Sequence, residues 1–195
     1  MSKLYVEMHS VNYIHMLINS ISNNDCFLAD SPGKGLGVFT NKDFKKGDFM
    51  TIYPKHVICE TQGDPSNNVF ACKSNCSQEI DSLDLENMTR YYSLRLMDPY
   101  TIAGDPKQIK DGLGHMINDG ARSKNINDIG IYITISMQKE NTEPCIICPQ
   151  ASHAWSTEPV YDCNTATVFM RATRDIRKGE ELFFHYGAPY WEDKY

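Results

Sequence analysis

Short β-rich runs separated by tight-turn signals recur along this 195-residue chain, and they restrict its fold class more than any other feature. The runs are rich in β-branched and aromatic residues, and glycine, asparagine and lysine–glycine pairs lie between them. The candidate strands are 26–29, 38–40, 49–59, 100–103, 129–137 and 167–172. Strands this short and this frequent predict a mainly β fold built from small sheets.

One segment carries a clear helical pattern. The apolar residues of 4–21 are spaced mostly three or four apart, which predicts an amphipathic N-terminal helix; they are Leu4, Met8, Val11, Ile14, Leu17, Ile18 and Ile21. Residues 83–96 are mixed in pattern and are expected to contain a short helix within them, whereas the polar or proline-rich stretches 61–77 and 138–165 predict loops. We therefore expect a helical extension at 1–24 and one domain at 25–195, with variable insertions at about 60–110 and 138–165.

The net charge indicates the class of partner, and the cysteine content indicates the cellular compartment. The net charge of −6 argues against free-standing nucleic-acid binding, which needs a basic face, and it suits a basic peptide partner. No apolar run approaches the ~18 residues of a membrane span, so we expect no membrane association. Seven cysteines without a secretory signal predict free thiols in an intracellular, reducing compartment, either nucleus or cytoplasm. The sequence gives no indication of oligomeric state.

Two cysteine pairs have spacings that tetrahedral zinc tolerates. Cys72 and Cys76 form the first pair, and Cys145 and Cys148 form the second. Both pairs fall in predicted loops, and nothing in the sequence brings them together in space. Free loop thiols are therefore the favoured interpretation, and a zinc-stabilised interaction protein is kept as an alternative.

Four short motifs carry candidate chemistry, and they occur in a fixed order. They are Lys34-Gly35-Leu36-Gly37, the strand residue Tyr53, the Asn118-Asp119-Gly120 segment, and Tyr186 after the Gly179-Glu180-Glu181-Leu182 stretch. The first three have ordinary structural explanations when taken alone: a hairpin turn, a half-buried strand tyrosine and an Asn-Asp-Gly turn. An asparagine amide is both donor and acceptor, which suits the amino-acid-like end of a ligand.

Taken together, the motifs resemble those of the SET-domain family of protein lysine methyltransferases across residues 33–191. Residues 115–119 resemble the family's Arg-Phe-Ile-Asn-His segment, and residues 179–187 resemble its C-terminal signature. The chain departs from the family pattern at Asp119, which replaces a histidine, and at His185, which replaces an aspartate. The resemblance implies a SET fold in which a knot-like C-terminal segment brings Asn118 and Tyr186 to one site.

The same resemblance implies transfer of methyl groups from S-adenosylmethionine to a lysine amine. Tyr186 and Tyr53 would orient the amine, and Phe184 would shape the pocket in favour of di- or trimethylation. The cofactor would be held by Lys34, Gly35, Leu36, Gly37, Asn118, Asp119 and Tyr186, with Trp191 near its adenine. No residue of this site is expected to bind a metal.

Family analogy makes a lysine-containing basic peptide, and a histone tail in particular, the expected substrate. Two alternatives stay open. The protein could methylate a non-histone protein, or it could be a catalytically weak SET-like module that binds a basic peptide, as the replacements at Asp119 and His185 suggest.

Overall fold

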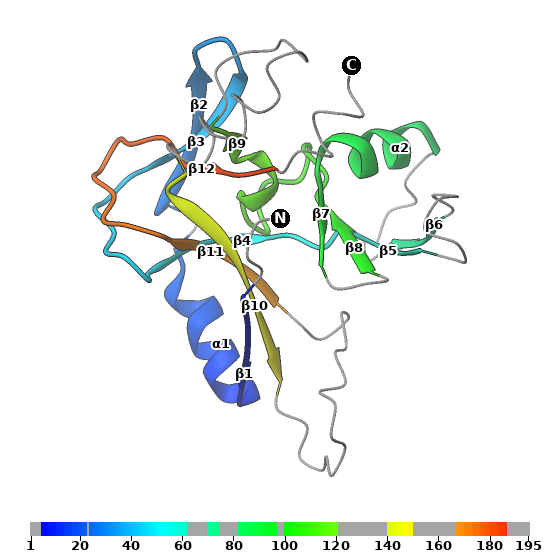
Figure 1. Cartoon of the computed structure of the whole chain (residues 1–195), viewed down its shortest axis with the longest axis horizontal. Coiled ribbons are helices and arrows are strands. Elements are labelled where there is room, and N and C mark those ends of the chain that lie inside the picture. Colours follow the sequence, from blue (N-terminus) through cyan, green and yellow to red (C-terminus); the bar gives the residue numbers. More distant parts are fainter. Residues whose placement is uncertain are drawn as a thin grey trace.

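A computed structural model describes residues 5–22, 24–61, 70–74, 82–96, 100–120, 140–149 and 167–186 of the chain. These residues form four small sheets and two α-helices (Figure 1). The predicted mainly β fold of short sheets with an N-terminal helix is therefore confirmed. The expected strand at 129–137 lies outside the described residues, as do Cys76 and Trp191.

The first sheet has the strand order β1-β10-β11-β4. Its strands are β1 (Tyr5–His9), β10 (Thr142–Pro149), β11 (Thr167–Ala172) and β4 (Phe49–Tyr53). Strand β1 runs parallel to β10, whereas the other neighbours are antiparallel. Helix α1 (Val11–Ser20) lies along this sheet and buries Ile14 and Leu17 against Cys145, Ile147 and Phe169 (Figure 1).

The N-terminal helix is shorter than the pattern of 4–21 predicts. Helix α1 begins after Ser10, whose side-chain oxygen accepts a hydrogen bond from the backbone N–H of Tyr13 as an N-cap. Residues Tyr5–His9 form β1 instead, because β10 offers their backbone a complete ladder of partners. Arg171 strengthens this pairing by binding the carboxylates of Glu7 and Glu143 at 3.0 and 2.8 Å.

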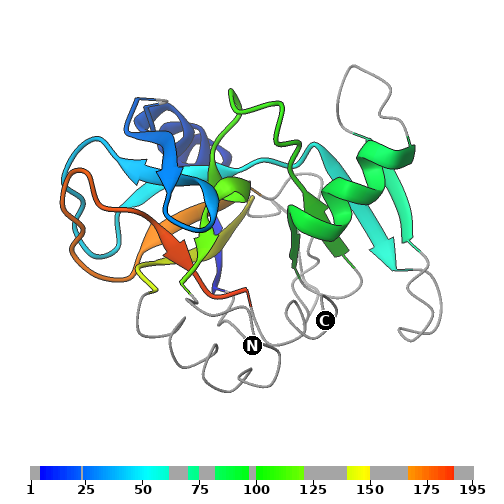
Figure 2. The same ribbon diagram turned by 90° about the horizontal axis from the view of Figure 1, so that it is seen from above.

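The second four-stranded sheet has the order β6-β5-β8-β7. Its strands are β5 (Val57–Thr61), β6 (Phe70–Ser74), β7 (Ser93–Arg95) and β8 (Tyr100–Ala103). Helix α2 (Ser82–Tyr91) lies over this sheet and buries Met88 against Val57, Cys59 and Ala103 (Figure 2). The expected strand at 49–59 is thus two strands, since Pro54 lies at the break between β4 and β5 and proline cannot donate to a ladder.

The loop predictions for the two insertions are wrong in part. Strand β6 lies within 61–77, and strand β10 lies within 138–165 despite Pro144 and Pro149. Cys72 and both cysteines of the second pair are consequently strand residues, and Cys145 is fully buried. The expectation of free thiols holds for Cys26 and Cys145 but is wrong for Cys59, which is disulfide-bonded.

Two smaller sheets complete the fold. Strand β2 (Cys26–Ser31) pairs with β3 (Gly35–Thr40) as a hairpin. Strand β12 (Phe183–Phe184) runs parallel to β9 (Asn118–Asp119), so the segment before Tyr186 lies beside the asparagine motif. The main core packs beneath these pairs, with Val38, Ile117 and Leu182 wholly buried.

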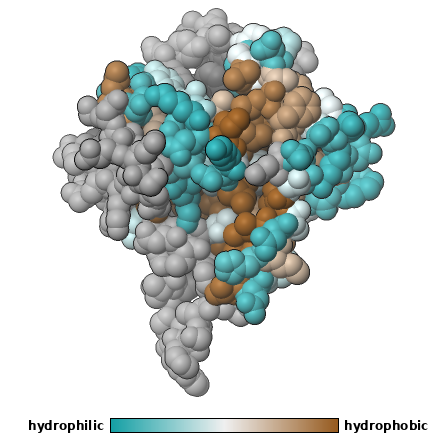
Figure 3. Space-filling view, turned by 180° about the vertical axis from the view of Figure 1, so that it is seen from behind, coloured by the Kyte–Doolittle hydropathy of each residue, from teal (hydrophilic) through white to brown (hydrophobic). Residues whose placement is uncertain are grey.

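The surface of the rear face carries a central band of apolar residues between hydrophilic margins (Figure 3). An open cavity of about 770 Å³ is lined by the end of α1, by β2 and β4, and by residues 109–113. It contains none of the site residues predicted from the sequence. Neither described helix is long and apolar enough to cross a membrane.

Candidate functional site

The glycine motif forms the turn and first residues of β3. Gly33 and Gly35 adopt φ values of 75° and 78°, the left-handed conformation that favours glycine. Gly37 is required for a different reason: a Cβ there would lie 2.3 Å from Glu181 Oε1 and 3.0 Å from Asn118 Nδ2. The β3 backbone can therefore approach the asparagine motif only because residue 37 has no side chain.

The side chain of Asn118 joins three segments that are far apart in the sequence. Its Nδ2 donates to the carbonyl oxygen of Leu36 and to Glu181 Oε1, both at 3.1 Å. The structure thus brings together the glycine motif, the asparagine motif and the C-terminal motif, as the resemblance implied. Glu181 itself was not predicted as a site residue, although it stands inside the C-terminal motif.

Asp119, at the position where the family has a histidine, is buried and makes two contacts with the site. Its side-chain Oδ2 accepts a 2.9 Å hydrogen bond from the backbone N–H of Tyr186. Its backbone oxygen accepts a hydrogen bond from Lys34 Nζ, which lies 5.4 Å from the centre of the Phe183 ring. Asp119 therefore fixes the backbone of Tyr186 and the ammonium group of Lys34.

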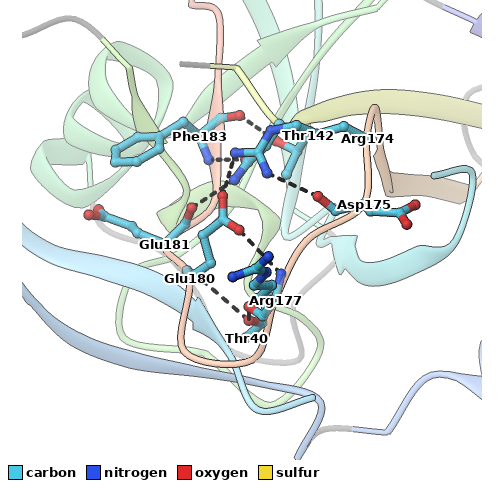
Figure 4. Close-up of polar contacts among 9 residues, drawn as sticks. Thr40, Thr142, Arg174, Asp175, Arg177, Glu180, Glu181 and Phe183 are labelled. Atoms are coloured by element: carbon cyan, nitrogen blue, oxygen red, sulfur yellow. Dashed lines mark hydrogen bonds and ion pairs between the residues drawn. The ribbon is translucent and has the colours of Figure 1, made fainter. Parts of the chain in front are cut away.

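The segment that leads to Tyr186 is held by a network of polar contacts (Figure 4). Thr40 Oγ1 donates to the carbonyl oxygen of Arg177, and Thr142 Oγ1 donates to that of Phe183, at 2.8 and 2.9 Å. Glu180 pairs with Arg174 in the same turn. Buried Asn141 donates to the Glu181 carbonyl and accepts from the Phe183 N–H. These contacts position the residues immediately before the tyrosine.

The two predicted catalytic tyrosines both donate their hydroxyl protons to backbone carbonyls. Tyr186 Oη lies 2.6 Å from the oxygen of Ile117, and Tyr53 Oη lies 2.9 Å from that of Tyr92. A phenol that donates in this way presents oxygen lone pairs to an N–H group. The Phe184 ring packs against Tyr186 with centroids 4.8 Å apart.

Two cavities meet beside Tyr186. The smaller one, of about 120 Å³, is lined by the predicted catalytic residues Tyr53, Phe184 and Tyr186, together with Tyr91, Ser93, Leu94, Arg95, His115 and His185. The other, of about 390 Å³, is lined by Lys34, Gly35, Leu36, Tyr91, Tyr92, His115, Met116, Asn118 and Tyr186. Only Tyr91, His115 and Tyr186 line both. A smaller pocket lined largely by aromatic residues therefore adjoins a larger one.

Two buried histidines on the smaller cavity were not predicted as site residues. Burial, together with the charge of the neighbouring His56, lowers the pKa of His115 to about 4. Burial also lowers the pKa of His185, and the charge of Asp119 opposes that effect. The Nδ1 atoms of both have no hydrogen-bond partner among the described residues. A sequence shows which residues flank a histidine but not whether its ring nitrogens find partners.

The described residues contain no group of three or more histidine, cysteine, aspartate or glutamate side chains placed to hold a metal ion. The larger cavity suits an organic cofactor better. Its volume lies within the range of small-molecule sites, and it combines a lysine ammonium, an asparagine amide and backbone exposed by glycines. This donor set fits a ligand with an amino-acid end, which is the kind of group the resemblance implies.

The family model for the SET domain matches residues 35–187 of the chain. Among solved structures, CpSET8 from Cryptosporidium is similar, with 22% identity and a TM-score of 0.46 over 83% of this chain and 57% of that one. A candidate histone methyltransferase of Plasmodium falciparum has 15% identity and a TM-score of 0.41 over 84% of this chain and 94% of that one. The chain thus spans little more than half of CpSET8. No curated protein matches it.

Proposed function

Because the chain belongs to the SET domain family, we propose that it transfers methyl groups from S-adenosylmethionine to the side-chain amine of a protein lysine. The observation that carries this proposal is the meeting of two cavities at Tyr186. One cavity has the polar groups that a cofactor needs, and the other has the aromatic walls that an alkyl amine needs.

The larger cavity would hold the cofactor, whose contribution is an electrophilic methyl group on a positively charged sulfur. Lys34 is fixed there by the Asp119 carbonyl, and its ammonium would attract the carboxylate end of the cofactor. The backbone of Gly35 and Leu36 and the amide of Asn118 would meet its amino-acid portion. Trp191, outside the described residues, remains our proposal for the adenine contact.

The smaller cavity would take the lysine side chain. A lysine amine has a pKa near ~10.4 and must lose its proton before nitrogen can attack a methyl carbon. The aromatic side chains of Tyr53 and Phe184 provide a poorly hydrated wall, which disfavours the ammonium form. The hydroxyl oxygens of Tyr186 and Tyr53 would accept from the amine N–H groups and align nitrogen with the methyl group, so that orientation supplies much of the rate.

The proposed substrate is a basic peptide segment, with a histone tail as the first choice by family analogy. The net charge of −6 supports a basic partner, because opposite charge raises the rate of encounter. A SET-like module that binds cofactor and peptide without turnover is the second candidate. Asp119 and His185 favour it, since both replace residues that the family pattern carries.

The test is mass spectrometry of core histones incubated with the protein and S-adenosylmethionine, with cofactor affinity measured separately by calorimetry. Tyr186→Phe removes the hydroxyl that donates to Ile117 and should reduce methylation about 100-fold. Tyr13→Phe is the matched control, because Tyr13 lies on α1 and lines neither cavity. Cofactor binding without methylation of histones or of cell-extract proteins would favour the binding module. Failure to bind the cofactor would refute the methyltransferase.

A further inference from the structure

Glu181 lies between strand β3 and the asparagine motif, although it lines neither cavity. Its backbone carbonyl oxygen accepts from Asn141 Nδ2 at 2.8 Å, and the residue forms an antiparallel bridge with β3. Its side chain points away from Arg174 and Arg177 (Figure 4). The carboxylate uses space that Gly37 leaves open, because a Cβ on Gly37 would lie 2.3 Å from Glu181 Oε1. Contacts of the backbone therefore set where this carboxylate lies.

The amide of Asn118 is oriented by two hydrogen-bond acceptors. Asn118 is the first residue of β9 and follows the short helix η2 (Gly114–Met116). Its Nδ2 lies 3.1 Å from the carbonyl oxygen of Leu36 and 3.1 Å from Glu181 Oε1. A carbonyl oxygen and a carboxylate can only accept, so both N–H groups of the amide are used here. The chemistry of the two partners thus determines which end of the amide is the nitrogen.

The oxygen of the Asn118 amide is the end that remains for a ligand. Within the part of the chain that the structure describes, Oδ1 has no hydrogen-bond partner, yet it stays accessible, unlike the closed Nδ1 atoms of His115 and His185. Asn118 lines the larger cavity together with Lys34, whose ammonium is fixed by the Asp119 carbonyl. This cavity therefore combines an acceptor from Asn118 with a cation from Lys34.

The amino-acid end of a ligand needs a different partner for each of its two charges. Its carboxylate is attracted by an ammonium such as that of Lys34, whereas its own ammonium can only donate and needs an oxygen acceptor. In the observed orientation Asn118 offers that oxygen. A reversed amide would direct two N–H groups at a group that also carries only N–H. The orientation of one carboxamide therefore decides whether the ammonium is bound or rejected.

We propose that Glu181 is a positioning residue of the cofactor site, which holds the Asn118 amide so that its oxygen accepts from the ammonium group of the cofactor. This inference rests on the proposed function and identifies the residue behind recognition of the cofactor's amino-acid end. Glu181 acts through Asn118, since it lines neither cavity. Gly37 belongs to the same arrangement, because any side chain there would occupy the space of the carboxylate.

The test is calorimetry with two ligands that differ in one group. The first is S-adenosylhomocysteine, which has the ammonium and the carboxylate but no sulfonium charge, and the second is its analogue without the α-amino group. Glu181→Gln keeps an acceptor at this position, and Glu181→Met fills similar space without one. Glu86→Ala is the matched control, because it removes the same charge from an exposed position on α2 that lines neither cavity. Thermal unfolding of each variant reports on folding.

We expect the wild-type protein to bind S-adenosylhomocysteine at least about tenfold more tightly than the analogue, the gain from one hydrogen bond to a charged group. Glu181→Met should weaken S-adenosylhomocysteine binding about fivefold, because the ligand must then order a released side chain. The same variant should bind the analogue as the wild type does. Glu181→Gln and the Glu86→Ala control should keep the wild-type affinity for both ligands.

Four results would overturn the inference. They are equal affinity of the wild-type protein for both ligands, equal weakening of both by Glu181→Met, no weakening by Glu181→Met, and equal losses in the Gln and Met variants. The second would indicate a merely structural role, and the last would indicate that the charge matters and the acceptor does not. If Glu181→Met does not fold, Glu181→Ala, which only removes atoms, takes its place. Failure of the wild-type protein to bind S-adenosylhomocysteine or S-adenosylmethionine would instead refute the proposed function.

Discussion

Lowering the pH from 7.5 to 5.0 should destabilise this protein through His115. The pKa of this histidine is 6.5 in its ordinary environment and about 4 in the folded state, where burial disfavours the imidazolium. The unfolded chain therefore binds a proton that the folded chain does not between these two values. The contribution of His115 to the free energy of unfolding is fully present above pH 6.5 and is lost as the pH drops toward 4. At about 1.4 kcal/mol per pKa unit, the total loss is about 3 kcal/mol, of which about 2 is reached by pH 5.0.

Other groups titrate in the same experiment and must be separated from His115. The pKa values of the Glu7 and Glu180 carboxyls lie below their ordinary value, so their contributions are lost mainly below pH 5. His185 changes stability in the same direction as His115, whereas the raised pKa of Glu140 acts in the opposite direction. These contributions remain in a variant that lacks only the buried imidazole.

The assay is urea unfolding at the two pH values for the wild-type protein and His115→Phe. The wild-type protein should lose about 2 kcal/mol more than the variant on acidification, because phenylalanine cannot bind a proton. An equal loss in both proteins, or a His115 pKa near 6.5 by NMR titration, would refute the reasoning.

Four further substitutions have definite expected outcomes, with Gly179→Ala serving as the comparison for Gly112→Ala. Gly37→Ala should weaken S-adenosylmethionine binding about tenfold by calorimetry, since its Cβ would displace the carboxylate of Glu181 from the asparagine motif. Gly112→Ala should cost more than about 2 kcal/mol in urea unfolding, because φ is +134° and the Cβ would lie 2.2 Å from a β4 carbonyl oxygen. Gly179→Ala, with φ +81° and nothing within 4 Å, should cost only about 1 kcal/mol; equal costs would contradict the steric argument. Phe184→Tyr places a hydroxyl in the 120 Å³ cavity and should shift the products toward fewer methyl groups by mass spectrometry; an unchanged distribution would contradict this.

Local pattern predicted the elements whose partners are local or whose composition is distinctive. The β2–β3 hairpin, β8 and β11 fall where β-branched runs and glycine turns place them, and α2 overlaps the mixed segment 83–96 that was expected to contain a short helix. The pattern failed at Tyr5–His9 and at Thr142–Pro149. These two strands are far apart in the sequence, and each is stabilised by pairing with the other. Local features such as the spacing of Met8 and Val11 or the presence of Pro144 do not indicate that a distant strand will pair there.

The candidate site likewise contains residues that the local sequence predicts and residues whose role depends on distant partners. The motif residues could be identified because several side-chain types recur in order. Most of those that the structure describes line two adjoining cavities, whereas Gly37 and Asp119 line neither. Glu181 and His115 could not be assigned a role in advance. The first matters through its distance from Asn118, and the second through its place beside both cavities, and neither is a property of local sequence.

The pairing of β1 with β10 has a consequence for how the chain is made. During synthesis the residues of Tyr5–His9 leave the ribosome well before their partners Cys145–Pro149. Pairing across such a separation is intrinsically slow, because loop-closure entropy is lost before the contacts form. Tyr186 emerges later still and joins Asp119 by a hydrogen bond. A chain that stops before Tyr186 therefore lacks a residue that lines both cavities of the candidate site.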